Sequence, residues 1–213
     1  MKNLTITFLL VSIVAMQAWT PSPSGEGRGE VALGLSIGDY APDFKLKNVD
    51  GKMVALADYK EAKGFVMVFT CNHCPYAKLY EDRIIELDKT LKTKGYPVIA
   101  INPNDVSKYP DDSFDNMKKR AKEKGFTFPY LIDESQETAR NYGAARTPHA
   151  FLLKHESAGK YKLMYAGAID DDTEGVKEWR EKYVELAIEA IEKGEPVNPT
   201  ITKAVGCTIK WKS

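Results

Sequence analysis

Cysteine is scarce in this chain, and neither charge sign is in excess. Its 213 residues include three cysteines, too few for a small domain that depends on a disulfide framework. Thirty Lys and Arg residues balance thirty Asp and Glu residues, so the formal net charge is zero. Binding to nucleic acid through bulk positive charge needs a basic footprint, and this composition argues against such a partner. The hydrophobic fraction of 43% excludes a mostly disordered or fibrous chain.

The N-terminus carries an apolar run that is too short to span a bilayer comfortably. The run from Leu4 to Met16, preceded by Lys2, has the length of a signal-peptide core. We predict a signal peptide over residues 1–18, export to the periplasm or an equivalent compartment, and no membrane span after cleavage. An uncleaved anchor or a buried helix is the alternative, because Met16 is a poor residue three positions before a cleavage site.

The remainder divides into a linker, a folded domain and a tail. Residues 19–34 are rich in Pro, Ser and Gly, which is typical of a flexible linker. Residues 35–195 are predicted to form one domain. Residues 196–213 are predicted to be a tail that docks on this domain, because apolar residues alternate with polar ones there: Val205, Ile209 and Trp211.

Strand-like and helix-like segments alternate through residues 35–195, which predicts an α/β sheet with helices on both faces. A hairpin is expected around Asp50-Gly51. Strands are predicted at 44–46, 53–56, 64–69, 96–101, 128–132, 150–154 and 162–166. Helices are predicted at 75–94, 113–124, 135–142 and 172–193. The inward face of the last helix is expected to carry Val176, Trp179, Tyr183, Leu186 and Ala190.

Two cysteines spaced three apart, Cys71 and Cys74, carry most of the predicted chemistry. Cys71 follows a buried strand, and Cys74 lies in the first turn of a helix, so the two sulfurs can alternate between dithiol and disulfide. The helix N-terminus favours the Cys71 thiolate, which we expect to be the exposed thiol, and a protonated His73 would add to this effect. A structural disulfide or half of a zinc site is the alternative. The sequence offers no second Cys/His pair to complete a zinc site.

A second landmark is Arg146-Thr147-Pro148, directly before a predicted core strand. Proline donates no backbone hydrogen bond, so its position needs a reason. A cis Thr147–Pro148 bond would be one, and an ordinary trans proline at the start of a strand is the other.

These motifs resemble the thioredoxin superfamily. The segments FTCNHCP at 69–75 and YGAARTP at 142–148 carry the resemblance, and IGDYAPDF at 37–44 with DGK at 50–52 resembles the entry motif of its redoxin (AhpC/TSA) branch. Within that branch the chain is most similar to peroxiredoxin-like proteins with a CNHC active site. The resemblance implies a thioredoxin-like fold, a central mixed β-sheet flanked by helices with an N-terminal β-hairpin extension.

The resemblance also implies roles for individual residues. Cys71 would be the nucleophile and Cys74 the resolving thiol, and Pro148 would be cis, with the Arg146–Thr147 backbone facing the substrate. The sequence departs from the family pattern at several positions. Phe65 replaces the buried acid, Thr70 replaces a tryptophan, and Arg146 replaces a third cysteine, as a cation that could stabilise a nearby thiolate.

We therefore predict an exported thiol–disulfide oxidoreductase that needs no cofactor and no metal. Its partners would be protein or small-molecule disulfides and thiols, together with a partner that recycles the redox pair. One alternative is a thiol-dependent peroxidase that passes Cys71 through sulfenic acid, although neither cysteine has a threonine three positions before it. Another is a copper-binding chaperone that uses Cys71, Cys74 and a histidine, since thiolates suit Cu(I).

Three features outside these motifs have competing interpretations. Cys207 is either buried and inert, paired between chains, or able to exchange with the Cys71–Cys74 pair; we favour the inert interpretation. His149 is predicted to pack against a buried strand rather than act on the thiols. The acidic residues 170–172 are predicted to form the N-terminus of the last helix rather than a cation site.

Overall fold

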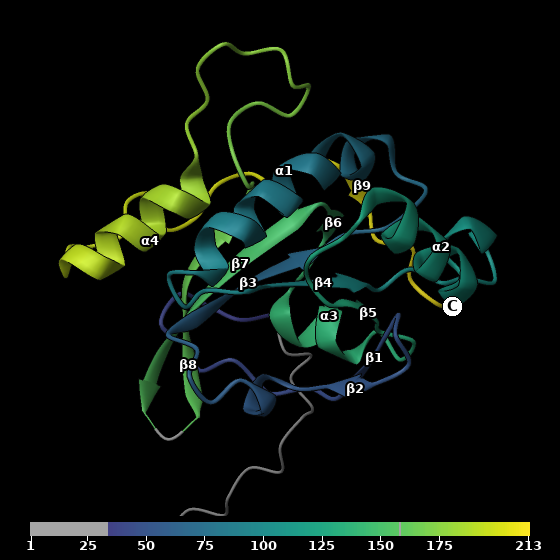
Figure 1. The fold of residues 1–213 in the computed structure, drawn as a ribbon, viewed down its shortest axis with the longest axis horizontal. Coiled ribbons are helices and arrows are strands. Elements are labelled where there is room, and N and C mark those ends of the chain that lie inside the picture. Colours follow the sequence, from purple (N-terminus) through teal and green to yellow (C-terminus); the bar gives the residue numbers. More distant parts are fainter. Residues whose placement is uncertain (1–33, 158) are drawn as a thin grey trace, which may run out of the picture. The chain divides into compact units, whose positions relative to one another are not determined.

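A mixed seven-stranded sheet forms the centre of the protein in a computed structural model, which describes residues 34–157 and 159–213 (Figure 1). The strand order is β2-β1-β5-β4-β3-β7-β8. β3 runs parallel to β4, and β4 parallel to β5, while the other neighbours are antiparallel. The strands are β1 (Leu46–Asn48), β2 (Met53–Val54), β3 (Gly64–Phe69), β4 (Val98–Asn102), β5 (Tyr130–Ile132), β7 (His149–Ser157) and β8 (Lys160–Gly167).

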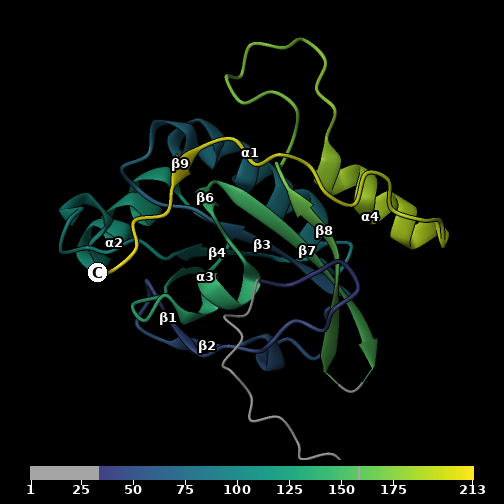
Figure 2. The ribbon, with the colours of Figure 1, turned by 180° about the vertical axis from the view of Figure 1, so that it is seen from behind.

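Helices cover both faces of this sheet. α1 and α4 pack on one face and α3 on the other, as Figures 1 and 2 show from opposite sides. The helices are α1 (Pro75–Lys92), α2 (Phe114–Lys124), α3 (Glu137–Tyr142) and α4 (Tyr183–Lys193), with short 3-10 turns η1 (Leu56–Asp58) and η2 (Pro110–Asp112). Within the described residues, no helix is both long and apolar enough to cross a membrane.

The central strand β3 holds the two halves of the core together. All six of its residues are buried. Val66 and Val68 point into the core beneath α1 and α4, whereas Phe65, Met67 and Phe69 point into the core beneath α3. Burial of each such side chain is worth about 1.5–3 kcal/mol, so β3 is a rigid platform for whatever follows Phe69.

Most predicted elements are present, with their ends displaced by a few residues. The strand predicted at 64–69 is confirmed without change, and the helix predicted at 75–94 ends at Lys92. The hairpin around Asp50-Gly51 is also confirmed: Leu46 pairs with Val54 and Lys47 with Met53. The predicted signal peptide and nearly all of the predicted linker lie outside the described residues.

The prediction of a helix over 172–193 is wrong for its first half, because α4 begins only at Tyr183. The Asp172 carboxylate accepts hydrogen bonds from the backbone N–H groups of Gly175, Val176 and Lys177 at 2.9–3.1 Å. Such a side-chain turn competes with helical hydrogen bonds, and Gly175 adopts a φ of 78°, which ends any helix. The side chain of Val176 is consequently 78% exposed, and that of Trp179 86%.

The inward face predicted for this helix is also largely wrong. Val184, Ala187 and Ile188 are the buried residues of α4, whereas Leu186 is 44% exposed. Tyr183 and Ala190 are only partly buried against the same core. Since the true helix starts eleven residues later than predicted, its register is set by the Val184–Ile188 stripe and not by the earlier apolar residues.

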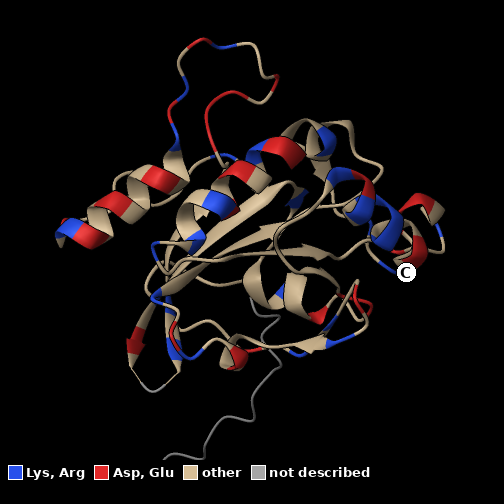
Figure 3. Ribbon diagram, viewed as in Figure 1, with Lys and Arg blue, Asp and Glu red and all other residues tan. Residues whose placement is uncertain are grey.

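The acidic residues 170–172 anchor a loop to α1 and do not begin a helix. Asp170 is buried and accepts hydrogen bonds from the Tyr80 hydroxyl at 2.8 Å and from Arg83 at 2.9 Å. Asp171 accepts the backbone N–H of Glu181 at 2.8 Å. These contacts tie Asp170 to α1 and join the two ends of the 170–182 loop, which projects from the fold with charged residues along it (Figure 3).

The C-terminal segment runs back along the sheet toward α2 (Figure 2). Thr200 and Thr202 exchange backbone hydrogen bonds with Ala166 at 3.0 and 3.1 Å. The segment then forms β9 (Cys207–Thr208), which pairs antiparallel with β6 (Arg146–Thr147) in a separate two-stranded sheet. Ile209 beyond it is buried at 3% exposure, whereas Val205 is 39% exposed.

Candidate active site

Cys71 and Cys74 lie between the rigid strand β3 and the first turn of α1. Cys71 follows the end of β3 by two residues, and Cys74 is the N-cap residue of α1, with Pro75 in the first turn. No disulfide joins the two cysteines in this structure, and both are buried, with exposures of 3% and 0%. The prediction that Cys71 is the exposed thiol is therefore wrong for this arrangement, in which the chain itself covers both sulfurs.

Thr147, in the motif that precedes Pro148, contacts both sulfurs, one with its hydroxyl and one with its backbone carbonyl. The Thr147–Pro148 bond is cis, as the resemblance implies. Cys71 Sγ lies 3.2 Å from the Thr147 hydroxyl, and a protonated Cys74 donates to the Thr147 carbonyl at 3.3 Å. Four of the predicted site residues, Cys71, Cys74, Thr147 and Pro148, thus come together, although more than 70 positions separate the two motifs in the chain.

Asp112 is a central residue of this site that sequence reasoning missed. Its side chain is fully buried. The carboxylate accepts hydrogen bonds from the backbone N–H groups of Asn72 at 2.6 Å and His73 at 3.2 Å, and from the Asn104 amide at 2.9 Å. His73 Nδ1 completes the set at 2.5 Å. Asp112 therefore fixes the backbone between the two cysteines.

Hydrogen bonding between the two thiols favours a negative charge on Cys74 over one on Cys71. The hydrogen bond with Cys74, burial and the Asp112 charge all raise the pKa of Cys71. Hydrogen bonding from the Cys71 thiol, the largest cause, lowers the pKa of Cys74 to about 4, and donors from Cys207 and the Ala77 N–H lower it further. This direction is opposite to the predicted Cys71 thiolate, and its largest cause is the hydrogen bond between the two thiols, followed for Cys71 by burial and by the Asp112 charge.

His73 is held by Asp112 on one side and by an aromatic ring on the other. Its imidazole stacks on Tyr109, with ring centroids 4.7 Å apart. Cys71 Sγ, His73 Nδ1 and the Asp112 carboxylate lie within 4.8 Å of one another, the one such group of possible metal ligands among the described residues. Zinc sites in proteins usually offer four ligands, and here the imidazole nitrogen already binds Asp112.

Replacement of His73 by alanine is expected to raise the pKa of Cys71 further. Without the imidazole, the Asp112 carboxylate loses a donor and exerts more of its negative charge on the Cys71 thiol. A less stable thiolate makes the disulfide relatively more favourable, so the couple becomes more reducing, by about tenfold or less in equilibrium constant. Thiolate absorbance titration and equilibration with glutathione measure both effects. His155→Ala, at a half-buried site in β7, is the control. Identical thiolate titrations and potentials for the two variants would show that His73 does not influence the thiols.

Arg146 contacts the C-terminal segment and not the Cys71–Cys74 pair. Its guanidinium donates to the Gly206 carbonyl at 3.0 Å. The positive charge lowers the pKa of Cys207, but burial of that thiol and its contact with Cys74 have the larger effect and raise the pKa to about 11. Arg146 therefore acts on Cys207, the third cysteine, rather than on the thiolate for which it was predicted.

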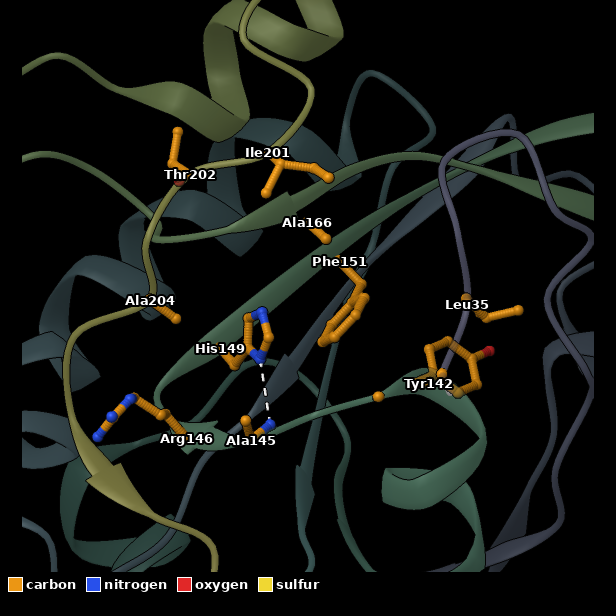
Figure 4. A pocket seen from close by; sticks show the side chains of 12 residues that line it. Leu35, Tyr142, Ala145, Arg146, His149, Phe151, Ala166, Ile201, Thr202 and Ala204 are labelled. Atoms are coloured by element: carbon orange, nitrogen blue, oxygen red, sulfur yellow. Dashed lines mark hydrogen bonds between the residues drawn. The ribbon is translucent and has the colours of Figure 1, made fainter. Parts of the chain in front are cut away.

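A largely apolar cavity of about 320 Å³ lies beside the proline motif (Figure 4). Its lining includes Leu35, Tyr142, His149, Phe151, Ile201 and Ala204. His149 Nδ1 accepts the backbone N–H of Ala145 at 3.4 Å, and burial lowers the pKa of His149 to about 4. No cysteine of the described residues lines this cavity, so the neutral His149 belongs to the packing beside the site and does not touch the thiols.

Comparison with known proteins places the chain in a family. Residues 37–164 match the AhpC/TSA family model. The thiol-disulfide oxidoreductase ResA of Geobacillus thermodenitrificans is 27% identical over 135 residues, which cover 63% of this chain and 72% of that protein.

Two solved structures are similar over a larger share of the chain. An uncharacterized conserved protein of Geobacillus kaustophilus is 39% identical, with a TM-score of 0.76, and the match covers 83% of this chain and 93% of that one. A hypothetical protein of Sinorhizobium meliloti is 32% identical, with a TM-score of 0.77 and coverages of 84% and 97%. Together with the mixed sheet and its flanking helices, the structural neighbours confirm the predicted thioredoxin-like fold.

Proposed function

Because this chain belongs to the AhpC/TSA family, we propose that it is an exported thiol–disulfide oxidoreductase that reacts through Cys71 and Cys74. The observation that carries the proposal is the convergence of both sulfurs on Thr147, next to the cis Thr147–Pro148 bond. The name of the ResA relative supports the reaction class. Its substrates are protein or small-molecule thiols and disulfides.

The Cys74 thiolate serves as the base that activates Cys71. In the resting site the Cys71 thiol donates toward Cys74, so transfer of that proton yields a Cys71 thiolate and a neutral Cys74. The Thr147 hydroxyl, 3.2 Å from Cys71 Sγ, then donates to the new thiolate, while the neutral Cys74 donates to the Thr147 carbonyl.

Exchange proceeds in two steps that balance. The Cys71 thiolate attacks one sulfur of a substrate disulfide, which forms a Cys71–substrate bond and releases the other substrate sulfur as a thiolate. Cys74 then gives its proton to the substrate thiolate released in the first step and attacks Cys71 Sγ, which forms the Cys71–Cys74 disulfide and releases the second substrate sulfur as a thiolate. The substrate gains two electrons and the protein loses two. The same steps in reverse oxidise a dithiol, and the reduction potential of the couple decides the direction.

Equilibration with glutathione buffers tests this proposal. The full chain is incubated at graded ratios of reduced to oxidised glutathione, quenched with acid and alkylated. We expect one two-electron transition, tenfold in ratio for about every 30 mV, together with catalysis of insulin reduction or of dithiol oxidation. Faster consumption of hydrogen peroxide than of any disulfide would contradict the proposal and favour the peroxidase alternative. A stoichiometric Cu(I) complex with negligible exchange would favour the copper chaperone.

The export part of the proposal rests on the N-terminal sequence. Residues 1–18 carry the apolar run of a signal peptide, and cleavage after Ala18 leaves a chain that begins at Trp19. Expression of the full chain in a bacterium, followed by fractionation and intact mass, should find that product in the periplasm. An uncleaved chain in the cytoplasmic fraction would contradict this part and leave the thiol chemistry untouched.

A further inference from the structure

The C-terminal strand occupies the edge that the proposed function assigns to the substrate. β9 pairs antiparallel with β6, so that Cys207 lies opposite Thr147 and Thr208 opposite Arg146. The backbone of Arg146 and Thr147 is the edge expected to face an incoming chain. An extended substrate therefore cannot use this edge until β9 leaves, and β9 itself presents a cysteine there.

The C-terminal segment packs so closely against Thr147 that only glycine fits at position 206. A Cβ atom on Gly206 would lie 2.2 Å from the Thr147 carbonyl oxygen, a distance that no side chain tolerates. Arg146 donates to the Gly206 carbonyl, and the Ile209 N–H donates to Ala145 at 3.1 Å. Farther along, the Lys210 N–H donates to Asn104 Oδ1 and the Lys210 carbonyl accepts from Gln136 Nε2, both at 2.8 Å. The segment is thus docked from Gly206 through Lys210.

This docking brings all three cysteines of the chain into one cluster. Cys71 and Cys74 are buried together with Ala77, and Cys207 packs against them. The thiol and the backbone N–H of Cys207 both interact with the Cys74 sulfur. Of the three cysteines only Cys207 is partly exposed, so it is the most accessible one to an external thiol while the segment stays docked.

We propose that Cys207 is a third redox thiol of this site, an internal substrate that forms a disulfide with Cys74. The proposal rests on the proposed exchange through Cys71 and Cys74. In the step, the Cys207 thiolate attacks Cys74 Sγ of the Cys71–Cys74 disulfide; the Cys74–Cys207 bond forms and the Cys71–Cys74 bond breaks. Cys207 is oxidised, Cys71 is reduced and takes up the proton that Cys207 gave up, and no outside oxidant is needed.

The Cys74–Cys207 disulfide provides a route by which an external thiol can reduce the buried Cys71–Cys74 pair. A small thiol reductant attacks the sulfur of the partly exposed Cys207 in the Cys74–Cys207 disulfide, and this frees Cys74 as a thiolate. A second thiol releases the reductant from Cys207. Both Cys71 and Cys74 are then reduced although neither was reached from solvent. The interpretation of Cys207 as inert is thereby replaced by a relay between the pair and its recycling partner.

Mass mapping of the full chain during oxidation tests the relay. Trypsin separates residues 64–78, which contain Cys71 and Cys74, from residues 204–210, which contain Cys207. After oxidation by oxidised glutathione, acid quench and N-ethylmaleimide, we expect these peptides to be cross-linked, with N-ethylmaleimide on Cys71. Complete alkylation of Cys207 while residues 64–78 hold an internal disulfide overturns the relay and leaves the proposed function intact. Alkylation of both Cys71 and Cys74, with no disulfide to either of them, overturns both the relay and the proposed function.

Two pairs of variants sharpen the result. Gly206→Ala should lower the yield of cross-linked peptide at least about tenfold, because it undocks Cys207 and removes a high effective concentration of that thiol. Val205→Ala, at the exposed neighbouring position, should leave the yield within about twofold. Equal yields would overturn the role of docking. In the second pair, Cys74→Ser should lose the cross-link, whereas Thr93→Ser, at an exposed position after α1, should keep it; a cross-link in Cys74→Ser would overturn the assignment to Cys74.

Discussion

Replacement of Cys71 by serine is expected to abolish disulfide exchange, with a loss of at least about a thousandfold. Exchange needs a thiolate, and a serine hydroxyl at this position stays protonated and cannot attack sulfur. The serine hydroxyl still fits beside Thr147, so the fold should be kept. Turnover of a model disulfide by the variant, at matched protein concentration, measures the loss.

The Cys74→Ser variant should behave differently, because its defect lies in the second step. Cys71 can still attack a substrate disulfide, but no neighbouring thiolate releases the product, so mixed disulfides with substrate accumulate. Thr93→Ser, at the exposed end of α1, is a control that should match the unmodified chain. Equal trapping by the two cysteine variants would contradict the assigned roles, and substantial exchange by Cys71→Ser would point to Cys74 and Cys207 as a working pair.

Replacement of Asp112 by asparagine is expected to be the most damaging change outside the cysteines. The carboxylate accepts four hydrogen bonds at a fully buried position, and an amide would direct two N–H groups at some of these donors. A buried polar group left without its partners costs about 1–3 kcal/mol, and a disrupted charged network costs more, so we expect a loss of about 3 kcal/mol in the free energy of unfolding.

The same variant should change the redox chemistry with a predictable sign. Loss of the negative charge lowers the pKa of Cys71, because Asp112 is one of the causes that raise it. A more stable thiolate favours the reduced form, so the couple becomes more oxidising. Denaturant unfolding and thiolate titration measure the two effects. Asp111→Asn, at the exposed neighbouring carboxylate, is the control; an Asp112→Asn chain indistinguishable from it in both measurements would contradict the role of Asp112.

The parts of the fold that local pattern determines could be predicted from the sequence. β3 is a short continuous apolar run because it is buried on both faces, and α1 carries its buried residues at helical spacing. Cys71 and Cys74 follow from their position between these two elements. The cis form of the Thr147–Pro148 bond came from the family resemblance, since sequence statistics alone favour a trans proline there.

The remaining features depend on contacts between distant segments. Asp112 lies in the segment Tyr109–Ser113, where nothing in the local pattern marks a buried acceptor, and only the packing of this segment against the cysteine loop makes its carboxylate one. Residues 172–182 have helical periodicity in their apolar side chains, but the Asp172 side chain satisfies the backbone N–H groups locally instead. The alternation around Cys207 predicted a docked strand without naming its partner, β6.

The placement of the three sulfurs also sets how readily each can move. β3 is paired with β7 over its whole length and with β4 from Val66 to Phe69, so its amide protons should be among the slowest to exchange with heavy water, and Cys71 and Cys74 follow directly from that strand. β9 has two residues and a single neighbouring strand, so it can open together with its flanking docking contacts without any change in the central sheet. The chain therefore joins its redox pair to the centre of the native fold and its third thiol to a short edge strand, and the site can open for a substrate by local separation of β9 while the rest of the protein stays folded.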